Sequence, residues 1–157
     1  MYIKNMNKSE LFELEGQVYF DLFSKDIQVF IEKDSNVNYA EQCAKCLNSL
    51  NEDIISSLCL ASIRYCNDFL DAIGEDTLKF DKATDVLALI TPSNMSVPIP
   101  QNRSESETVV NLELNCTWEE EHGLQWIIRG NKVLYVGAYN GVDPWGDCDL
   151  GKEWNYV

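Results

Sequence analysis

The sequence predicts an α+β domain: an antiparallel β-sheet with an αα-hairpin packed on one of its faces. Residues 11–32 alternate apolar and polar side chains with the period of two that strands have. Residues 39–73 place apolar side chains at helical spacing, and residues 110–136 return to the period of two. Because strands and helices do not alternate along the chain, a doubly wound parallel fold is disfavoured. We expect residues 1–157 to form a single domain, since this is an ordinary domain length.

The first strands form a hairpin or meander with one buried face. Val18 and Phe20 alternate with Tyr19 and Asp21, and the polar stretch 24–26 separates this strand from a second one at 27–31. Aromatic and β-branched residues at this period are typical of half-buried strands.

Two helices come next, joined by a very short turn. Tyr39, Cys43 and Leu47 share one face of the first helix. Asn51 is placed to cap the second helix, and Gly74 is placed to end it. Helices connected this closely form an αα-hairpin that can lie on a sheet.

Residues 75–107 carry weaker patterns. The apolar run 86–90 is compatible with a short strand, Pro92, Pro98 and Pro100 interrupt the stretch after it, and 101–107 is polar, so we expect a flexible connection. Residues 110–116, 124–128 and 133–135 alternate as strands, and Gly130-Asn131 predicts a tight turn between the last two. The tail from 139 to 157 has no clear period.

Acidic residues outnumber basic ones by more than solubility requires. The chain has 26 Asp and Glu against 12 Lys and Arg, a net charge of −14, whereas a magnitude of about 2–8 suffices for a small domain. Self-repulsion of this charge costs folding free energy, and its field attracts positively charged molecules. We therefore expect a basic protein partner. Nucleic acid is disfavoured as a partner, because a phosphate backbone requires a basic surface.

Cysteine usage and hydropathy indicate a cytoplasmic protein with no membrane partner. The N-terminus lacks the apolar core of a signal peptide, and no apolar stretch has the length of a membrane span. Cysteines on apolar helix faces behave as small buried hydrophobes, and a reducing cytosol keeps them free. The pair Cys43-x-x-Cys46 permits a redox or zinc half-site as the alternative, but the sequence has no second ligand pair to complete it.

One cluster, Glu119, Glu120, Glu121 and His122, has the residue types of a catalytic or metal site. Carboxylates beside an imidazole serve in acid–base and metal-dependent catalysis. However, adjacent residues in a turn point in different directions, and the chain has no second histidine to complete a zinc site. A solvated turn is the preferred interpretation, and we expect no catalytic residue, metal or cofactor.

The tail places three acids around a tryptophan. Asp143, Asp147 and Asp149 resemble the start of a calcium loop, but the acid required at loop position 12 would fall at Trp154. The simpler interpretation is a turn around Trp145. That tryptophan either closes one end of the core or serves as a contact for a partner.

Residues 116–124 read Cys-Thr-Trp-Glu-Glu-Glu-His-Gly-Leu, and a hairpin ending in Val136-Gly137 comes after them. This part of the chain resembles an uncharacterised bacterial domain family with a Cys-x-Trp-(acidic)-x-Glu-His-Gly-Leu signature. That family has no assigned activity, so the resemblance implies none. In size, acidity and α+β layout the chain is also similar to immunity proteins of contact-dependent inhibition systems. This similarity implies a role in neutralising a secreted toxin.

Three functions remain open at this point. The first, which we favour, is an immunity protein that binds a basic toxin domain, such as a nuclease effector, and is not an enzyme. The second is a metal-dependent hydrolase-like enzyme that uses His122 and nearby carboxylates, and the third is a non-catalytic adaptor. The surface predicted to contact the toxin consists of Glu105, Glu107, Glu119, Glu120, Glu121, Asp143, Trp145, Asp147 and Asp149.

Overall fold

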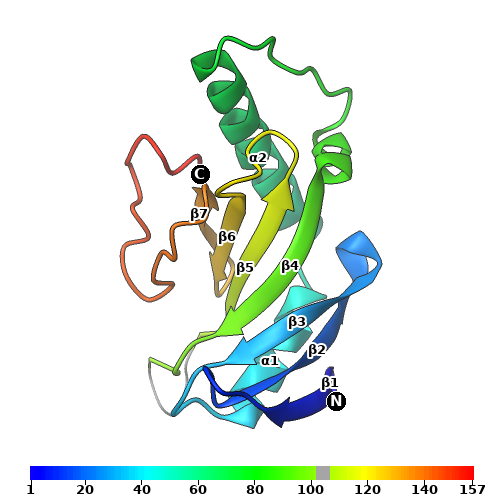
Figure 1. The fold of residues 1–157 in the computed structure, drawn as a ribbon, viewed down its shortest axis with the longest axis vertical. Coiled ribbons are helices and arrows are strands. Elements are labelled where there is room, and N and C mark those ends of the chain that lie inside the picture. Colours follow the sequence, from blue (N-terminus) through cyan, green and yellow to red (C-terminus); the bar gives the residue numbers. More distant parts are fainter. Residues whose placement is uncertain (102–106) are drawn as a thin grey trace.

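A computed structural model describes residues 1–101 and 107–157. It contains one seven-stranded sheet in which the strands lie in chain order, with two α-helices and two short 3-10 helices (Figure 1). The elements are β1 (Ile3–Lys8), β2 (Leu14–Phe20), η1 (Asp21–Phe23), β3 (Lys25–Ile31), α1 (Val37–Leu47), α2 (Glu52–Ala72), η2 (Ala83–Leu89), β4 (Ile90–Val97), β5 (Val109–Cys116), β6 (Leu124–Arg129) and β7 (Lys132–Gly137).

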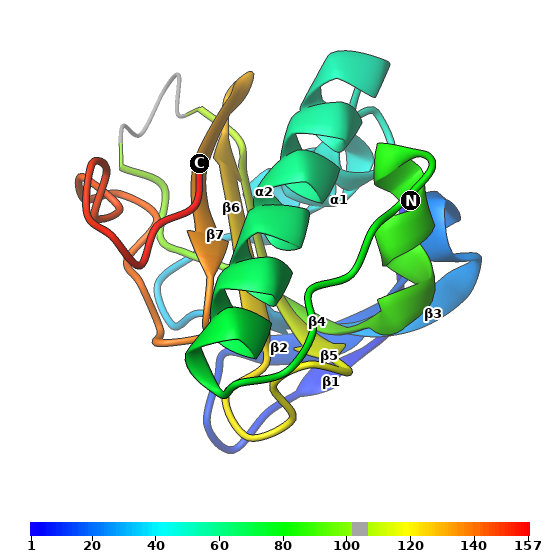
Figure 2. The same ribbon diagram turned by 90° about the horizontal axis from the view of Figure 1, so that it is seen from above.

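The predicted α+β class is confirmed, with one difference in the sheet. Neighbouring strands are antiparallel except β3 and β4, which are parallel from the pair Gln28–Asn94 to the pair Ile31–Val97. The two α-helices lie between β3 and β4 in the chain and form the crossover that a parallel pair requires. Both helices lie on one face of the sheet (Figure 2), as predicted.

The core lies between these helices and the sheet. Leu112, Leu114 and Trp126 are fully buried on the strands, as is Leu58 on α2. The Trp126 indole donates to the hydroxyl of Ser62 (3.0 Å), which donates in turn to the Leu58 carbonyl (2.7 Å). These two bonds satisfy the polar atoms that burial removes from water.

Local sequence fixes the ends of α2. The Asn51 side chain accepts from the Ile54 N–H (2.9 Å), so the predicted cap is confirmed. Gly74 has φ 78°, and the next residue, Glu75, donates its N–H to the Leu70 carbonyl (2.8 Å). This is the left-handed ending for which glycine is suited.

The predicted secondary structure was wrong or incomplete at three places. Residues 86–90, expected as a strand, belong mainly to η2, and the region expected as a loop contains β4. Pro92 is tolerated in β4 because the pairing with β5 is irregular between Pro92 and Asn94. The polar β1 was not predicted; only Ile3 of its six residues is buried, and Asn5 has φ 56°.

The tail covers the other face of β6 and β7. Ile127, Leu134 and Tyr135 form a second apolar cluster with Cys148 of the tail. Asn155, 8% exposed, donates to the Leu134 and Cys148 carbonyls (2.8 and 2.9 Å). The outer edge of β7 is therefore occupied by the chain's own tail.

All six cysteines are free, and five of them are buried: Cys43, Cys59, Cys66, Cys116 and Cys148. Their packing role is confirmed by their place in the two apolar clusters. The exception, Cys46, is half-buried, with its sulfur 3.0 Å from the Thr108 hydroxyl. Among the described residues, no helix combines the length and hydrophobicity of a membrane span.

Candidate functional site

The connection between β5 and β6 is built around the carboxylate of Glu119. One of its oxygens accepts from the N–H groups of Glu121 (2.9 Å) and His122 (3.1 Å), and the other lies 2.6 Å from Nδ1 of His122. Gly123 completes the turn by donating to the Glu119 carbonyl (3.0 Å). Gly123 has φ 69°, and a Cβ there would lie 2.6 Å from the Leu114 carbonyl oxygen, so only glycine fits without strain.

This connection is fixed to the C-terminal half of α2. The Tyr65 hydroxyl donates to the Gly123 carbonyl (2.9 Å), and the Tyr65 ring meets Trp118 edge-on at 5.6 Å. Cys116 donates its S–H to the Glu119 carbonyl (3.4 Å). Within residues 116–124, the side chains of Cys116, Trp118 and Glu119 therefore all make contacts that hold the connection in place. Trp118 is 7% exposed, and its Nε1 has no partner among the described residues.

Hydrogen bonding sets the charge state of Glu119. Burial by itself would raise its pKa, but the bonds from His122 and Glu121 outweigh burial and hold the pKa below its ordinary value of 4.5. Glu119 is therefore an anion at neutral pH, and its side chain is 10% exposed. It acts mainly as an internal cap of the turn.

The same residues offer three potential metal ligands. One ligand atom each from Glu119, Glu121 and His122 lies within 4.8 Å of the others. One oxygen of Glu119 already accepts two hydrogen bonds and the other contacts Nδ1 of His122, so a cation would have to displace these contacts.

Sequence reasoning missed a second group of acids beside this loop. Asp68, Asp71, Glu75 and Asp76 lie at the C-terminal end of α2 and just beyond it, and all four are exposed. Figures 1 and 2 place the β5–β6 connection beside the C-terminal half of α2, and in Figure 1 the last turn of the helix extends beyond it. We call the combined surface the acidic end; it consists of Asp68, Asp71, Glu75, Asp76, Glu119, Glu120 and Glu121.

The acidic end opposes the dipole of its own helix. Asp71 lies in the last turn of α2, where no basic residue is present, and the partial charge of a helix C-terminus is negative. The sequence could have revealed this group, because four acids fall within nine residues at the predicted end of a helix, where negative charge is unfavourable.

Glu107 lies at the opposite end of the sheet from the acidic end. Its carboxylate lies against Gly130, 2.5 Å from where a Cβ would stand. Glu107 precedes β5 and Glu119 comes after it; the eight residues of β5, at about 3.3 Å each, separate their positions by about 26 Å. Glu105 lies outside the described residues. The predicted contact surface therefore does not form one continuous group.

The tail acids hold the tail together. Asp143 accepts from the Trp145 N–H (3.0 Å), Asp147 from the Asp149 N–H (3.0 Å), and Asp149 from the Trp154 indole (3.0 Å). The Trp145 indole donates to the Ile99 carbonyl (2.9 Å), and its ring packs partly against the core. Trp145 thus closes one end of the core and is half-buried.

Few basic side chains neutralise the acids. Among the described residues, the one ion pair made by a lysine or arginine joins Lys4 and Asp26 (2.8 Å). Arg64 binds the Tyr156 carbonyl and Arg129 the Pro144 carbonyl, so neither described arginine is committed to a carboxylate. The negative field of the acidic end is therefore mostly unbalanced by ion pairs within the described part of the protein.

The fold and this surface define an acidic α+β domain with a helical pair on one face of a mostly antiparallel sheet. Residues 2–144 match the model of a family described as a domain of unknown function, DUF6985, and the chain belongs to that family. No curated protein and no solved structure matches the chain.

Proposed function

We propose that this protein is a cytoplasmic immunity protein that binds a basic toxin domain, such as a nuclease effector of a contact-dependent inhibition system, and blocks it without catalysis. The observation that carries the proposal is the acidic end. It gathers seven acidic residues, six of them exposed, at the end of α2 and on the β5–β6 connection, although the charge of Asp71 opposes the dipole of α2. These charges lower the stability of the folded protein and are nevertheless present, which favours a role for them in binding.

The electrostatics suit a basic partner. A nuclease must contact phosphates and therefore presents a positive surface. A complementary negative surface accelerates encounter and suppresses association with acidic proteins. The field acts over roughly 10 Å at about 0.1 M salt, so the association rate falls as salt rises.

The edges of the sheet favour contact through side chains over addition of a partner strand. On β7, Tyr156 donates its N–H to the Val136 carbonyl (2.9 Å), and Asn155 occupies the neighbouring groups. On β1, the pairing is irregular between Lys4 and Asn7, which interrupts the flat edge that a partner strand needs. Both edges thus discourage strand addition.

The hydrolase-like alternative ranks lower because Glu119 is committed to the turn through three contacts. If that alternative is right, a divalent cation should bind the folded protein and so raise its melting temperature. The adaptor alternative shares the acidic surface but requires a different basic partner. Genome context separates it, because an immunity gene should lie directly behind a large secreted toxin gene.

The test is binding to the protein encoded immediately upstream, measured by titration calorimetry at two salt concentrations. The triple variant D71K/E120K/E121K reverses three charges of the acidic end and should weaken binding at least about tenfold. The control E10K/E13K/E32K reverses three exposed charges at the other end of the sheet and should change affinity much less. Equal effects of the two variants, or binding independent of salt, would contradict the proposal.

A further inference from the structure

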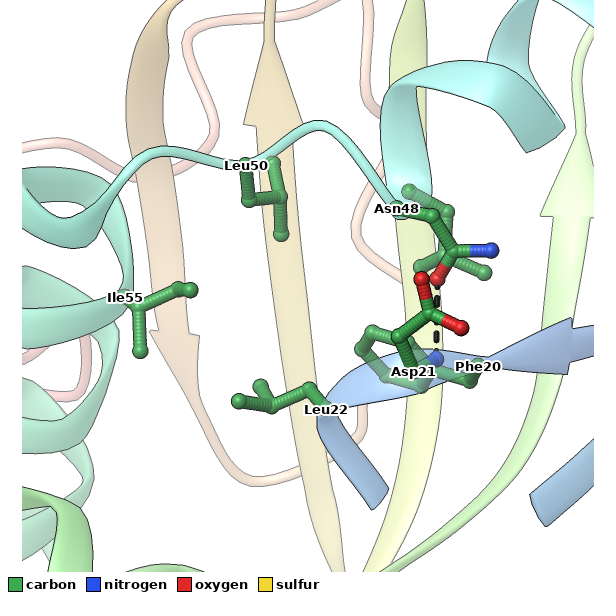
Figure 3. A pocket seen from close by; sticks show the side chains of 7 residues that line it. Phe20, Asp21, Leu22, Asn48, Leu50 and Ile55 are labelled. Atoms are coloured by element: carbon green, nitrogen blue, oxygen red, sulfur yellow. Dashed lines mark hydrogen bonds between the residues drawn. The ribbon is translucent and has the colours of Figure 1, made fainter. Parts of the chain in front are cut away.

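A surface pocket of about 250 Å³ lies where η1 meets the turn between α1 and α2. Figure 3 shows Leu22, Leu50 and Ile55 surrounding it from three different elements. Most of its lining is apolar, and none of the lining side chains is cationic: Phe20, Asp21, Leu22, Leu47, Asn48, Leu50 and Ile55.

Asn48 joins two walls of the pocket. Its side chain accepts from the Asp21 N–H (2.9 Å) and donates to the Tyr19 carbonyl (2.7 Å), so the end of β2 is tied to the C-terminal cap of α1. The third wall begins at Asn51, whose side chain caps α2. Because these bonds already hold the walls, little ordering is needed when an occupant enters.

One acidic side chain, Asp21, lines the pocket. The Asp21 carboxylate is exposed and makes no hydrogen bond or ion pair among the described residues. An apolar occupant with positive neighbours would therefore meet complementary groups.

We propose that this pocket receives one apolar side chain of the basic partner, and that Asp21 pairs with a lysine or arginine next to that side chain. The inference rests on the proposed function and adds a specific contact to it. The volume is below the roughly 300–1,000 Å³ of small-molecule sites, which favours a single side chain. A second copy of this chain is disfavoured as the occupant, because its net charge of −14 would repel it.

The first experiment fills the pocket. L50F places a larger side chain inside it and should weaken binding of the upstream-encoded protein about 10- to 100-fold, the effect of losing one buried apolar side chain. L60F makes the same change at an exposed position of α2 and should leave affinity within about twofold. If L50F fails to fold, D21N, a substitution at an exposed position, tests the same pocket. It should weaken binding of the upstream-encoded protein and make that binding less dependent on salt concentration.

A second probe does not depend on the identity of the partner. The tripeptide Lys-Leu-Lys, titrated into labelled protein, should shift the methyl resonances of Leu22, Leu50 and Ile55. Lys-Ser-Lys should leave them unshifted, and Glu-Leu-Glu should bind more weakly.

The outcomes separate the two proposals. If charge reversal at the acidic end weakens partner binding but L50F, D21N and the peptides have no effect, the function stands and the pocket inference is overturned. If the upstream protein does not bind at all, the proposed function fails. Methyl shifts with Lys-Leu-Lys would then still support the pocket as a site for a basic, apolar chain, and their absence would overturn it.

Discussion

Replacing Asp71 by asparagine should stabilise the protein while weakening its binding. Asp71 is an exposed anion in the last turn of α2, which contains no basic residue. A charge of the wrong sign at a helix end costs about 0.3–1 kcal/mol, and the like charge of Asp68 three residues earlier adds about 0.2–0.5 kcal/mol. Asparagine and aspartate have similar helix propensities, so the charge is the main change.

The expected gain for D71N is therefore about 0.5–1.5 kcal/mol at low salt. For a chain of this length, it corresponds to a rise in melting temperature of about 1–6 °C. Urea unfolding at low salt, monitored by circular dichroism, gives the free energy of unfolding. High salt should shrink the difference.

The same substitution at the other end of the helix is the matched control. Asp53 is exposed in the first turn of α2, where a negative charge is favourable. D53N should therefore lower stability by about 0.3–1 kcal/mol, opposite in sign to D71N. If both variants shift stability in the same direction, the dipole argument is refuted. If D71N stabilises the protein and leaves partner binding unchanged, Asp71 lies outside the contact surface.

Three further outcomes test the β5–β6 connection and the core. G123A should cost at least about 2 kcal/mol in urea unfolding, because alanine disfavours φ 69° and its Cβ would clash with the Leu114 carbonyl. Since the pKa of Glu119 is lower in the folded protein, its contribution to stability is present above its ordinary value of 4.5 and is lost as pH falls through the lowered pKa. In E119Q the free energy of unfolding should therefore fall less steeply than in the native protein as the pH drops below 4.5. An unchanged pH dependence would contradict the role of this carboxylate. In the native protein a thiol reagent should modify Cys46 at most, because burial raises the pKa of Cys43, Cys59 and Cys66 to about 11 and that of Cys116 to about 12. Burial also raises the pKa of Cys148, and rapid reaction of several thiols would refute this packing.

Elements with local signals were predictable from the sequence. Asn51 and Gly74 mark the ends of α2 through interactions within a few residues, and the period of two identified β5, β6 and β7. The strands β4 and β1 escaped prediction because their pairing compensates for poor local signals. Pro92 lies at an irregularity of the ladder, and β1 is mostly exposed at an edge.

The sequence alone determined the charge of −14, the fold class and the ends of α2, because each depends on composition or on residues close together in the chain. Only the tertiary structure decided which acids lie together. It brought the C-terminal half of α2 next to the connection that carries Glu119, Glu120 and Glu121 and placed Glu107 at the other end of β5, since strand length and helix packing set those distances. It also formed the pocket at Asn48, where η1, α1 and α2 meet through contacts that sequence spacing does not encode.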